Sequence, residues 1–524
     1  MSNTKGSYLV LTAMIFAVSM TFIDQTIVSI SVPEIQKDLG LSSTGVQWIV
    51  NGYLISLAAL FALGGKLADV FGRRRMVVLG VLIFATSSAL CGATPTGDLA
   101  EPWMITFRVI QGAGAALMFP AALAIVISSF PINERGKAMA IFFGITGAFT
   151  SIGPIAGGYL SEWTWRSIFW INIPVALLAL FFIWKSKPED KRRPQPMDYR
   201  GAVLIAFGMG LAVLGFQQAS TWGWTSPATI GCIIAGALLL VGFVLFELKQ
   251  ENPLIRVRIF KDRSFSVDNV ILFMLSIAFV PMFLFASMYS QISLGWEASE
   301  AGLYLLIFFG GFAAASQWGG RILDSKGARP AVVLGCLVAA VGYALWAHKM
   351  TDIDGGANAQ WMYIVLAGIG IGLVLGPVST DAVNRAPNTS YGEATGITQT
   401  VRNFAASLGL GVMGSILIVQ NRLNIEDKLA AFNVPKEEAD KVAASLSQSG
   451  GGDSGTMGEH VSKAQEADLF RAVQEAFAAS TQTIFYIMAG AMAVAFFIAL
   501  IWSPPGKMEE VILDEDDAVP GTPS

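Results

Sequence analysis

Charged residues are scarce in this chain of 524 residues. They make up 14% of the sequence, whereas soluble proteins carry roughly 25%. Hydrophobic residues make up 54%, and the mean hydropathy is +0.58. This composition argues against a soluble domain and is typical of a protein that crosses a membrane many times. The net charge of −4 says little, because the sidedness of Lys and Arg decides how such a protein inserts.

Residues that build metal sites, disulfides and many active sites are also few. The three cysteines, Cys91, Cys232 and Cys336, lie far apart inside apolar runs, and the two histidines are His348 and His460. No metal site or disulfide framework is therefore expected. The sequence also lacks a nucleotide-binding loop and a nucleophile–base constellation. We expect neither an ATP-driven pump nor an enzyme, and we expect no cofactor and no nucleic-acid partner.

Long apolar runs account for most of what is present. Fourteen are long enough to span a bilayer, near residues 8–32, 46–66, 76–94, 103–130, 137–160, 166–185, 200–218, 227–247, 266–289, 300–319, 330–348, 361–383, 393–419 and 481–502. The first run lacks a cleavage site and is interpreted as a retained helix. Most Lys and Arg residues fall on the side of the two termini. We therefore expect a multi-pass protein of the plasma (cell inner) membrane with both termini in the cytoplasm.

One connector between apolar runs occurs twice. The positions that recur 255 residues later are Gly64, Gly65, Asp69, Gly72 and Arg74, which correspond to Gly319, Gly320, Asp324, Gly327 and Arg329. Each copy joins two spanning runs on the cytoplasmic side. The repeat predicts two related membrane halves, each with a short basic connector that contains glycine.

The offset is too long for six spans, so two further spans are expected between the halves. We predict a first six-helix bundle over 1–186 and a linker with two inserted helices and a following cytoplasmic loop over 187–265. A second bundle is predicted over 266–505 and a disordered acidic tail over 506–524. The long outer loop, 420–480, contains amphipathic stretches. It is expected to be either a partly helical cap or simply solvated.

Four stretches resemble the major facilitator superfamily, in its fourteen-helix drug:proton antiporter branch. They are GKLADVFGRRR at 65–75, DQTIVSISVP at 24–33, RVIQGAG at 108–114 and GPIAGG at 153–158. The resemblance implies an all-α fold of two six-helix bundles, here with two extra helices between them. It also implies a central cavity that opens to one side at a time, with sites near the midplane.

Three polar residues are expected deep in the membrane. Asp24 lies about two-thirds of the way across the first span, at about 1.5 Å per residue. Arg108 enters the fourth span from the other side to a similar depth, with Gln111 one turn further on. The resemblance places both spans at the cavity, so we expect Asp24 and Arg108 to pair. Asp24 could bind a proton or a cationic substrate, with Arg108 setting its proton affinity; the alternative is a static structural pair.

Two other motifs suggest moving parts. The repeated connector is interpreted as a conformational latch, although it could merely fix topology; the residues concerned are Gly65, Asp69, Gly72, Arg73, Arg74, Asp324 and Arg329. The fifth span carries small residues along one face and a proline, which predicts a tight, bendable seam between the halves. The alternative there is ordinary packing of small residues. The resemblance makes this stretch the antiporter signature, and its residues are Gly147, Gly153, Pro154, Gly157 and Gly158.

The remaining charges within spans are Arg402, Asp268 and Asp381. Arg402 is expected near the midplane, where it could bind an anionic group or meet helix-terminal carbonyls. Asp268 and Asp381 fall near cytoplasmic helix ends, where a solvated position is expected rather than proton coupling; Asp381 is the better candidate for coupling.

These observations favour a proton-coupled antiporter that exports lipophilic small molecules, cationic ones included, by alternating access. Multidrug efflux and antibiotic resistance would follow from such an activity. The alternative is a dedicated exporter of one metabolite, lipid, siderophore or antibiotic. The expected partners are the substrate, protons and membrane lipid, and the chain is expected to act as a monomer.

Overall fold

The structure is a computed structural model that describes residues 4–41, 43–190, 196–250, 253–386, 391–430 and 463–507. Within these ranges the regular structure is helical. The acidic tail and the middle of the long outer loop, for which disorder or solvation was predicted, lie outside the described residues.

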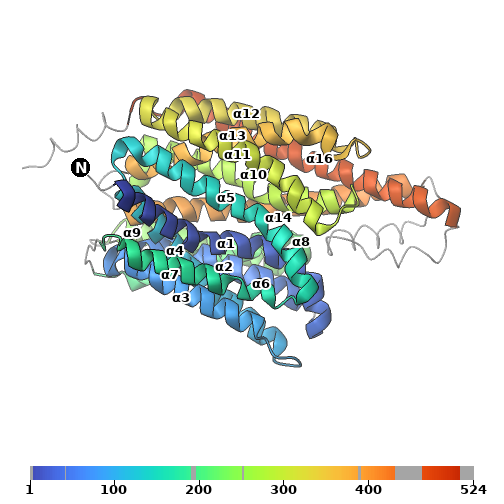
Figure 1. Ribbon diagram of the computed structural model, residues 1–524, viewed down its shortest axis with the longest axis horizontal. Coiled ribbons are helices and arrows are strands. Elements are labelled where there is room, and N and C mark those ends of the chain that lie inside the picture. Colours follow the sequence, from blue (N-terminus) through green and yellow to red (C-terminus); the bar gives the residue numbers. More distant parts are fainter. Residues whose placement is uncertain are drawn as a thin grey trace, which may run out of the picture.

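The helices form two groups with two helices inserted between them (Figure 1). The first group consists of α1 (Thr4–Leu39), α2 (Ser43–Phe71), α3 (Arg73–Gly92), α4 (Ala100–Ser129), α5 (Ile132–Trp163), α6 (Ser167–Trp170) and α7 (Asn172–Ser186). The insertion consists of α8 (Tyr199–Trp222), α9 (Pro227–Glu247) and the short 3-10 helix η1 (Val257–Lys261). The second group consists of α10 (Arg263–Ile292), α11 (Ala298–Lys326), α12 (Ala328–Met350), α13 (Gly356–Asn384), α14 (Tyr391–Ala430) and α16 (Lys463–Trp502).

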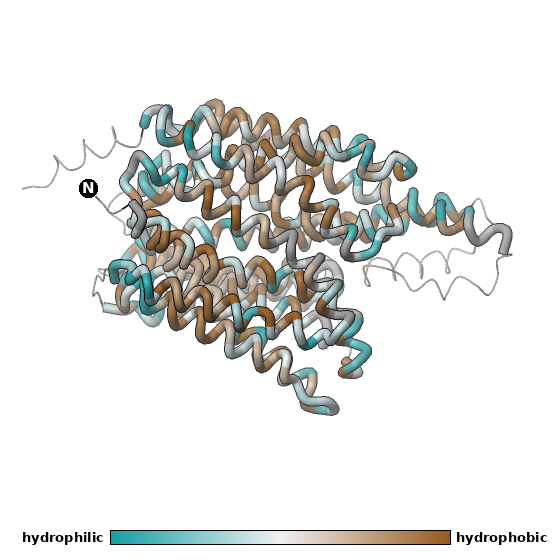
Figure 2. Tube along the Cα trace, viewed as in Figure 1, coloured by the Kyte–Doolittle hydropathy of each residue, from teal (hydrophilic) through white to brown (hydrophobic). Residues whose placement is uncertain are grey.

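The helices match the predicted spans closely. Thirteen segments of the described chain are long and apolar enough to cross a membrane. Helix α5, which is not one of the thirteen, is 32 residues long and packs beside them. The predicted sixth span is interrupted at Ile171, which separates α6 from α7. Figure 2 shows apolar residues along the middle of the helices and polar residues at both ends. This banding is what a bilayer requires of a spanning bundle.

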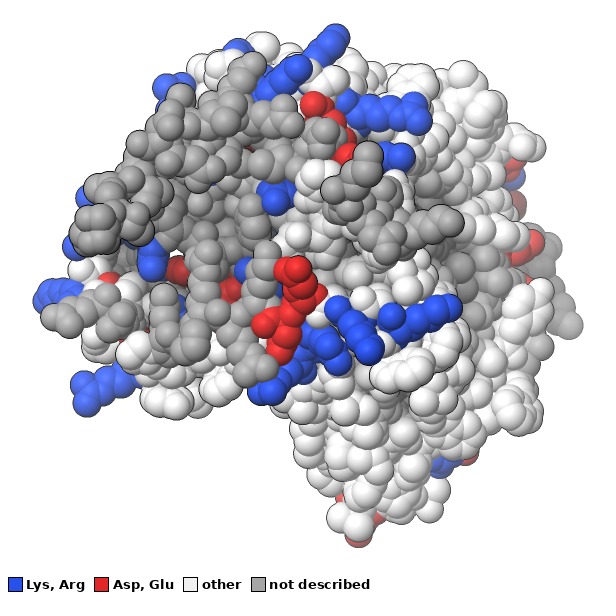
Figure 3. Space-filling view, turned by 60° about the vertical axis from the view of Figure 1, so that its left-hand side comes forward, with Lys and Arg blue, Asp and Glu red and all other residues white. Residues whose placement is uncertain are grey.

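Each repeated connector is a sharp turn around one glycine. Gly72 separates α2 from α3 with φ of 109°, and Gly327 separates α11 from α12 with φ of 86°. Positive φ is readily adopted only by glycine, which explains why glycine stands at both positions. The end of the molecule that contains these two turns is called the connector end below. Figure 3 looks toward this end and shows Lys and Arg side chains gathered over it.

The predicted outer loop is shorter than expected. Helix α14 continues to Ala430 and α16 begins at Lys463, so both flanks of the stretch 420–480 are helical. Asn424 donates to Ser480 (2.9 Å), and Lys428 pairs with Glu475 (2.7 Å). The end of α14 therefore lies against α16, whose first turns project beyond the rest of the bundle (Figure 1). The solvated alternative is wrong for these flanks, because their apolar residues Ile425, Leu429, Leu469 and Val473 are buried.

The inserted helix α8 touches both bundles. Its Phe216 backbone lies against Gly411 of α14, and Gly210 faces Ala59 of α2. Trp224, just after α8, donates to the Ser415 hydroxyl of α14 (2.5 Å). Helix α8 therefore covers the line along which α2 and α14 meet.

Candidate functional site

A cavity of about 400 Å³ lies between the two bundles. Helices α1, α2, α4 and α5 line it from the first bundle, and α10, α11, α13 and α14 from the second. Most lining side chains are apolar or aromatic. The lining residues that carry a formal charge are Arg108 and Arg402.

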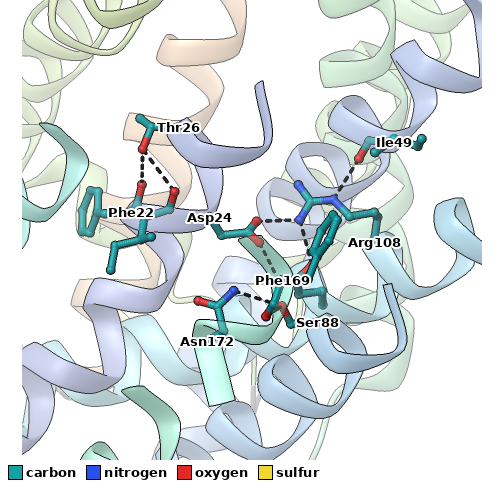
Figure 4. A network of polar contacts seen from close by, with 10 residues as sticks. Phe22, Asp24, Thr26, Ile49, Ser88, Arg108, Phe169 and Asn172 are labelled. Carbon is teal, nitrogen blue, oxygen red and sulfur yellow. Dashed lines mark hydrogen bonds and ion pairs between the residues drawn. The ribbon is translucent and has the colours of Figure 1, made fainter. Parts of the chain in front are cut away.

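Asp24 lies beside this cavity in a fully buried polar group (Figure 4). Arg108 Nη1 donates to Asp24 Oδ2 (2.5 Å), and Gln111 Nε2 donates to Asp24 Oδ1 (2.8 Å). The same Arg108 nitrogen also donates to Gln111 Oε1 (2.8 Å). Helices α1 and α4 therefore meet at the level expected from the sequence, and both carboxylate oxygens have a donor.

Two further contacts hold the Arg108 guanidinium in place. Its Nε donates to the Ile49 carbonyl (3.0 Å), and its centre lies 4.5 Å from the centroid of the Tyr53 ring. Nothing in the sequence singled out Tyr53, because a tyrosine within an apolar span is most often a packing residue. Breaking a buried pair of this kind leaves an uncompensated charge and costs about 3–5 kcal/mol. A proton on Asp24 would therefore change the state of a side chain that lines the cavity.

A second polar group, in the lower part of Figure 4, is structural. Ser88 of α3 donates to the Phe169 carbonyl (2.8 Å), and Asn172 donates to the Ser88 hydroxyl (2.9 Å). These bonds satisfy the backbone where the sixth span is interrupted, which a membrane interior requires.

Arg402 lies apart from the Asp24 group, in the wall of the same cavity. Its Nη1 donates to Gln399 (3.2 Å) and its guanidinium faces the Phe143 ring, 5.6 Å from the centroid. Its Nε is buried without a hydrogen-bond partner among the described residues.

Asp381 lies outside the cavity lining, close to the connector end. It accepts two bonds from Arg385 Nε (2.8 and 2.9 Å). Asp268 of α10 faces it. Both carboxyls are fully buried, so the solvated positions expected for them are wrong. The two acids share a side-chain hydrogen bond, and within the described residues no other donor reaches the carboxyl of Asp268. The sequence could not reveal this, because it depends on how α10 packs on α13.

The first connector contains an internal ion pair and lies close to the second bundle. Arg73 pairs with Asp69 (3.1 Å), and both side chains are buried. Gly65 lies against Gly396 near the start of α14. Arg74, the next residue along the chain, is half-buried, and no hydrogen bond or ion pair within the described part of the chain involves it.

The second connector contacts the first bundle directly. Asp324 accepts bonds from the backbone N–H groups of Gly136 (2.9 Å) and Lys137 (3.1 Å) in the second turn of α5. A carboxylate near the N-terminal end of a helix is also favoured by the helix dipole. Gly136 and Gly320 are in backbone contact at the same place. Arg329 instead donates to the Leu500 carbonyl of α16 (2.8 Å), within its own bundle.

The small residues of α5 face two different neighbours, so the expected single seam between the halves is partly wrong. Gly147 lies against Phe309 and Phe312 of α11, in the other bundle. Gly153 lies against Thr26 and Gly157 against Ile27, both on α1. The neighbour of the glycine face of α5 therefore changes along the helix. Gly153 and Gly157, which are further from the connector end, pack within their own bundle. Pro154 and Gly158 lie within α5, but their side-chain surroundings are outside what the structure describes.

Comparison with known proteins agrees with this architecture. The family model of the Major Facilitator Superfamily matches residues 14–410. The tetracenomycin C resistance and export protein of Streptomyces glaucescens is 33% identical over 83% of this chain and 80% of its own length. The multidrug transporter protein MdtP of Bacillus subtilis is 29% identical over 81% and 78%.

Among solved structures, the proton:xylose symporter XylE superposes with a TM-score of 0.61. The alignment covers 97% of this chain and 98% of that one, at 14% identity. That likeness concerns the fold alone.

Proposed function

Because the chain belongs to the Major Facilitator Superfamily, we propose that it exports lipophilic small molecules in exchange for protons by alternating access. It is a multi-pass membrane protein, and its relatives include proteins named for drug resistance and export. One observation carries the coupling proposal: a fully buried carboxyl, Asp24, is bonded to Arg108, which itself lines the cavity.

The coupling would work through the charge of Asp24. In the structure Asp24 has the bonding pattern of an ionised carboxylate, because both its oxygens accept from Arg108 and Gln111. A proton on Asp24 removes the negative charge that holds Arg108. The guanidinium is then free to interact with Gln111, Tyr53 or a molecule in the cavity. Substrate and proton would in this way both act on the Asp24–Arg108 pair, which is either formed or broken. Thermodynamic coupling requires such a shared element.

The proposal includes an orientation. Lys and Arg side chains gather over the connector end (Figure 3), and basic connectors stay in the cytoplasm. The bundles meet at this end through three contacts. Asp324 of α11 accepts from the α5 backbone, the Gly136 and Gly320 backbones touch, and Arg135 donates to Asn384 (2.5 Å). The conformation would then be closed toward the cytoplasm in a plasma-membrane protein. The connectors would act as the latch of this closed state.

The test is Asp24→Asn in proteoliposomes with an imposed proton gradient. We expect proton-driven movement of a fluorescent lipophilic substrate to be lost, because asparagine cannot take up the proton. Asp98→Asn, which changes an exposed acid at the opposite end, is the matched control and should transport normally. Undiminished proton coupling in a well-folded Asp24→Asn protein would contradict the proposal.

A second candidate is a dedicated exporter of one compound. The relative from Streptomyces glaucescens, named for resistance to and export of the single compound tetracenomycin C, favours it. Growth of deletion and overexpression strains on a chemically broad panel of toxins separates the two: protection against one compound class supports the dedicated exporter, and protection against many supports multidrug efflux.

A further inference from the structure

The cavity holds two guanidinium groups, and their surroundings differ. Arg108 is paired with Asp24 and further bonded to Gln111 and the Ile49 carbonyl. Among the described residues, the hydrogen-bond partner of Arg402 is the neutral Gln399. Within the described residues no carboxylate pairs with Arg402, and its Nε has no acceptor. The cavity wall therefore carries one positive charge without a counter-ion.

An unpaired charge at this depth is costly. Only 9% of the Arg402 surface is exposed, and a buried ion without a partner is disfavoured by several kcal/mol. Packing does not explain it, since an apolar residue would fill the same space without that cost. Charged groups within membrane spans are functional sites by default. The missing element is an anion that enters the cavity.

The position of Arg402 indicates what chemical groups the anion must have besides its charge. Arg402 and Phe143 are the lining residues of α14 and α5 nearest the connector end, so the charge lies at the inner end of the cavity. Phe279 and Phe312, which stack with ring centroids 5.9 Å apart, also line the cavity. A ligand that reaches Arg402 must therefore present an apolar, preferably flat, body to aromatic rings.

We propose that Arg402 binds the acidic group of the transported molecule, and that the substrate class is lipophilic aromatic anions. This inference deepens the proposed function, and it depends on that function for the claim that the bound molecule is transported. The guanidinium is suited to the task, because its planar fork can bond both oxygens of a carboxylate or two of a sulfonate. The charge count disfavours cationic substrates, since the one lining charge without a counter-ion is positive.

Binding of two matched fluorescent probes to the purified full chain tests this. The anionic probe is 8-anilinonaphthalene-1-sulfonate, and the neutral probe is N-phenyl-1-naphthylamine, which has the same rings without the sulfonate. Saturable binding is measured in phosphatidylcholine nanodiscs, with empty nanodiscs subtracted and no proton gradient. We expect Arg402→Gln to weaken sulfonate binding about tenfold or more, as for a charge-assisted hydrogen bond, and to leave the neutral probe unchanged.

Two further variants sharpen the result. Arg402→Lys should recover part of the sulfonate affinity, because it restores the charge without the planar fork. Arg422→Gln removes an exposed charge from the same helix, where Arg422 pairs with Glu426, and should change neither probe. Neutral-probe binding also reports that the variants fold.

The proposal is overturned if wild-type protein shows no saturable binding of the sulfonate probe. It is also overturned if Arg402→Gln leaves sulfonate affinity intact or weakens both probes equally. Because the assay contains no gradient, its outcome is independent of proton coupling. A protein that binds the sulfonate through Arg402 yet fails the Asp24 test would keep this inference and lose the proposed antiport.

Discussion

At the residue scale, three buried acids of the same type have three different environments. Asp24 has two donors and Asp381 is paired with Arg385, whereas the hydrogen-bond partner of Asp268 within the described residues is another acid, Asp381. Burying an acid against a second acid is destabilising, and replacing it with an amide that can donate to its neighbour can be neutral or favourable. A buried charge left without its partner is strongly destabilising. The three positions therefore predict different responses to the same substitution.

We expect Asp268→Asn to leave the apparent melting temperature unchanged or to raise it. Asp381→Asn should lower it, because Arg385 then loses its partner at a cost of about 3 kcal/mol. Thermal unfolding of the two purified variants, followed by tryptophan fluorescence, is the measurement. A larger loss of stability in Asp268→Asn than in Asp381→Asn would show that this description of the acid pair is wrong.

At the scale of elements, the contact between α5 and α11 closes the connector end. Gly136 and Gly320 are in backbone contact there, and a methyl group added at Gly320 would lie 2.7 Å from the Gly136 carbonyl carbon. That distance is far below ordinary contact, so one helix must shift. Gly310 on the same helix has no neighbour within 4 Å of such a methyl group. The pair of glycines allows the effect of crowding to be separated from helix propensity.

Gly320→Ala should open the connector end by about tenfold in population, since overpacking costs about 1–3 kcal/mol. Gly310→Ala should leave the population unchanged. Spin labels at the exposed Lys137 and Arg321, in a cysteine-free background, report the distance across this end by pulsed electron paramagnetic resonance. Equal distance distributions in the two alanine variants would contradict the proposed role of the contact.

At the scale of the whole molecule, the repeat places a connector of each bundle against a helix of the other. Asp324 accepts from two backbone N–H groups of α5, and Gly65 lies against Gly396 of α14. The connectors lie away from the cavity, and none of their residues lines it. Latching and ligand binding should therefore be separable.

Asp69→Asn and Asp324→Asn should each slow proton-driven turnover severalfold while probe binding is retained, because the closed state loses about 1 kcal/mol or more of bonding. Turnover in proteoliposomes and probe affinity in nanodiscs are measured on the same preparations. Asp354→Asn, an exposed acid in the loop after α12, is the control. Complete loss of binding in a well-folded Asp69→Asn protein would contradict this division of roles.

The sequence by itself determined the membrane class, the helix positions and the two-fold repeat. These features depend only on residues that are close together in the sequence. Apolar runs must be long enough to span the membrane, and Gly72 and Gly327 recur because both turns need positive φ. The resemblance to a known family added the expectation that Asp24 meets Arg108, and the structure places them 2.5 Å apart.

Only the tertiary structure decided which charges have partners. Asp381 and Asp268 are buried together, Gly153 and Gly157 face α1 and not the other bundle, and Arg402 has no counter-ion among the described residues. Each of these facts depends on the rotation and depth of a helix that is distant in sequence. Hydrophobic periodicity cannot set that rotation in a chain whose helices are apolar on nearly every face, so the neighbours of a polar residue emerge only from packing.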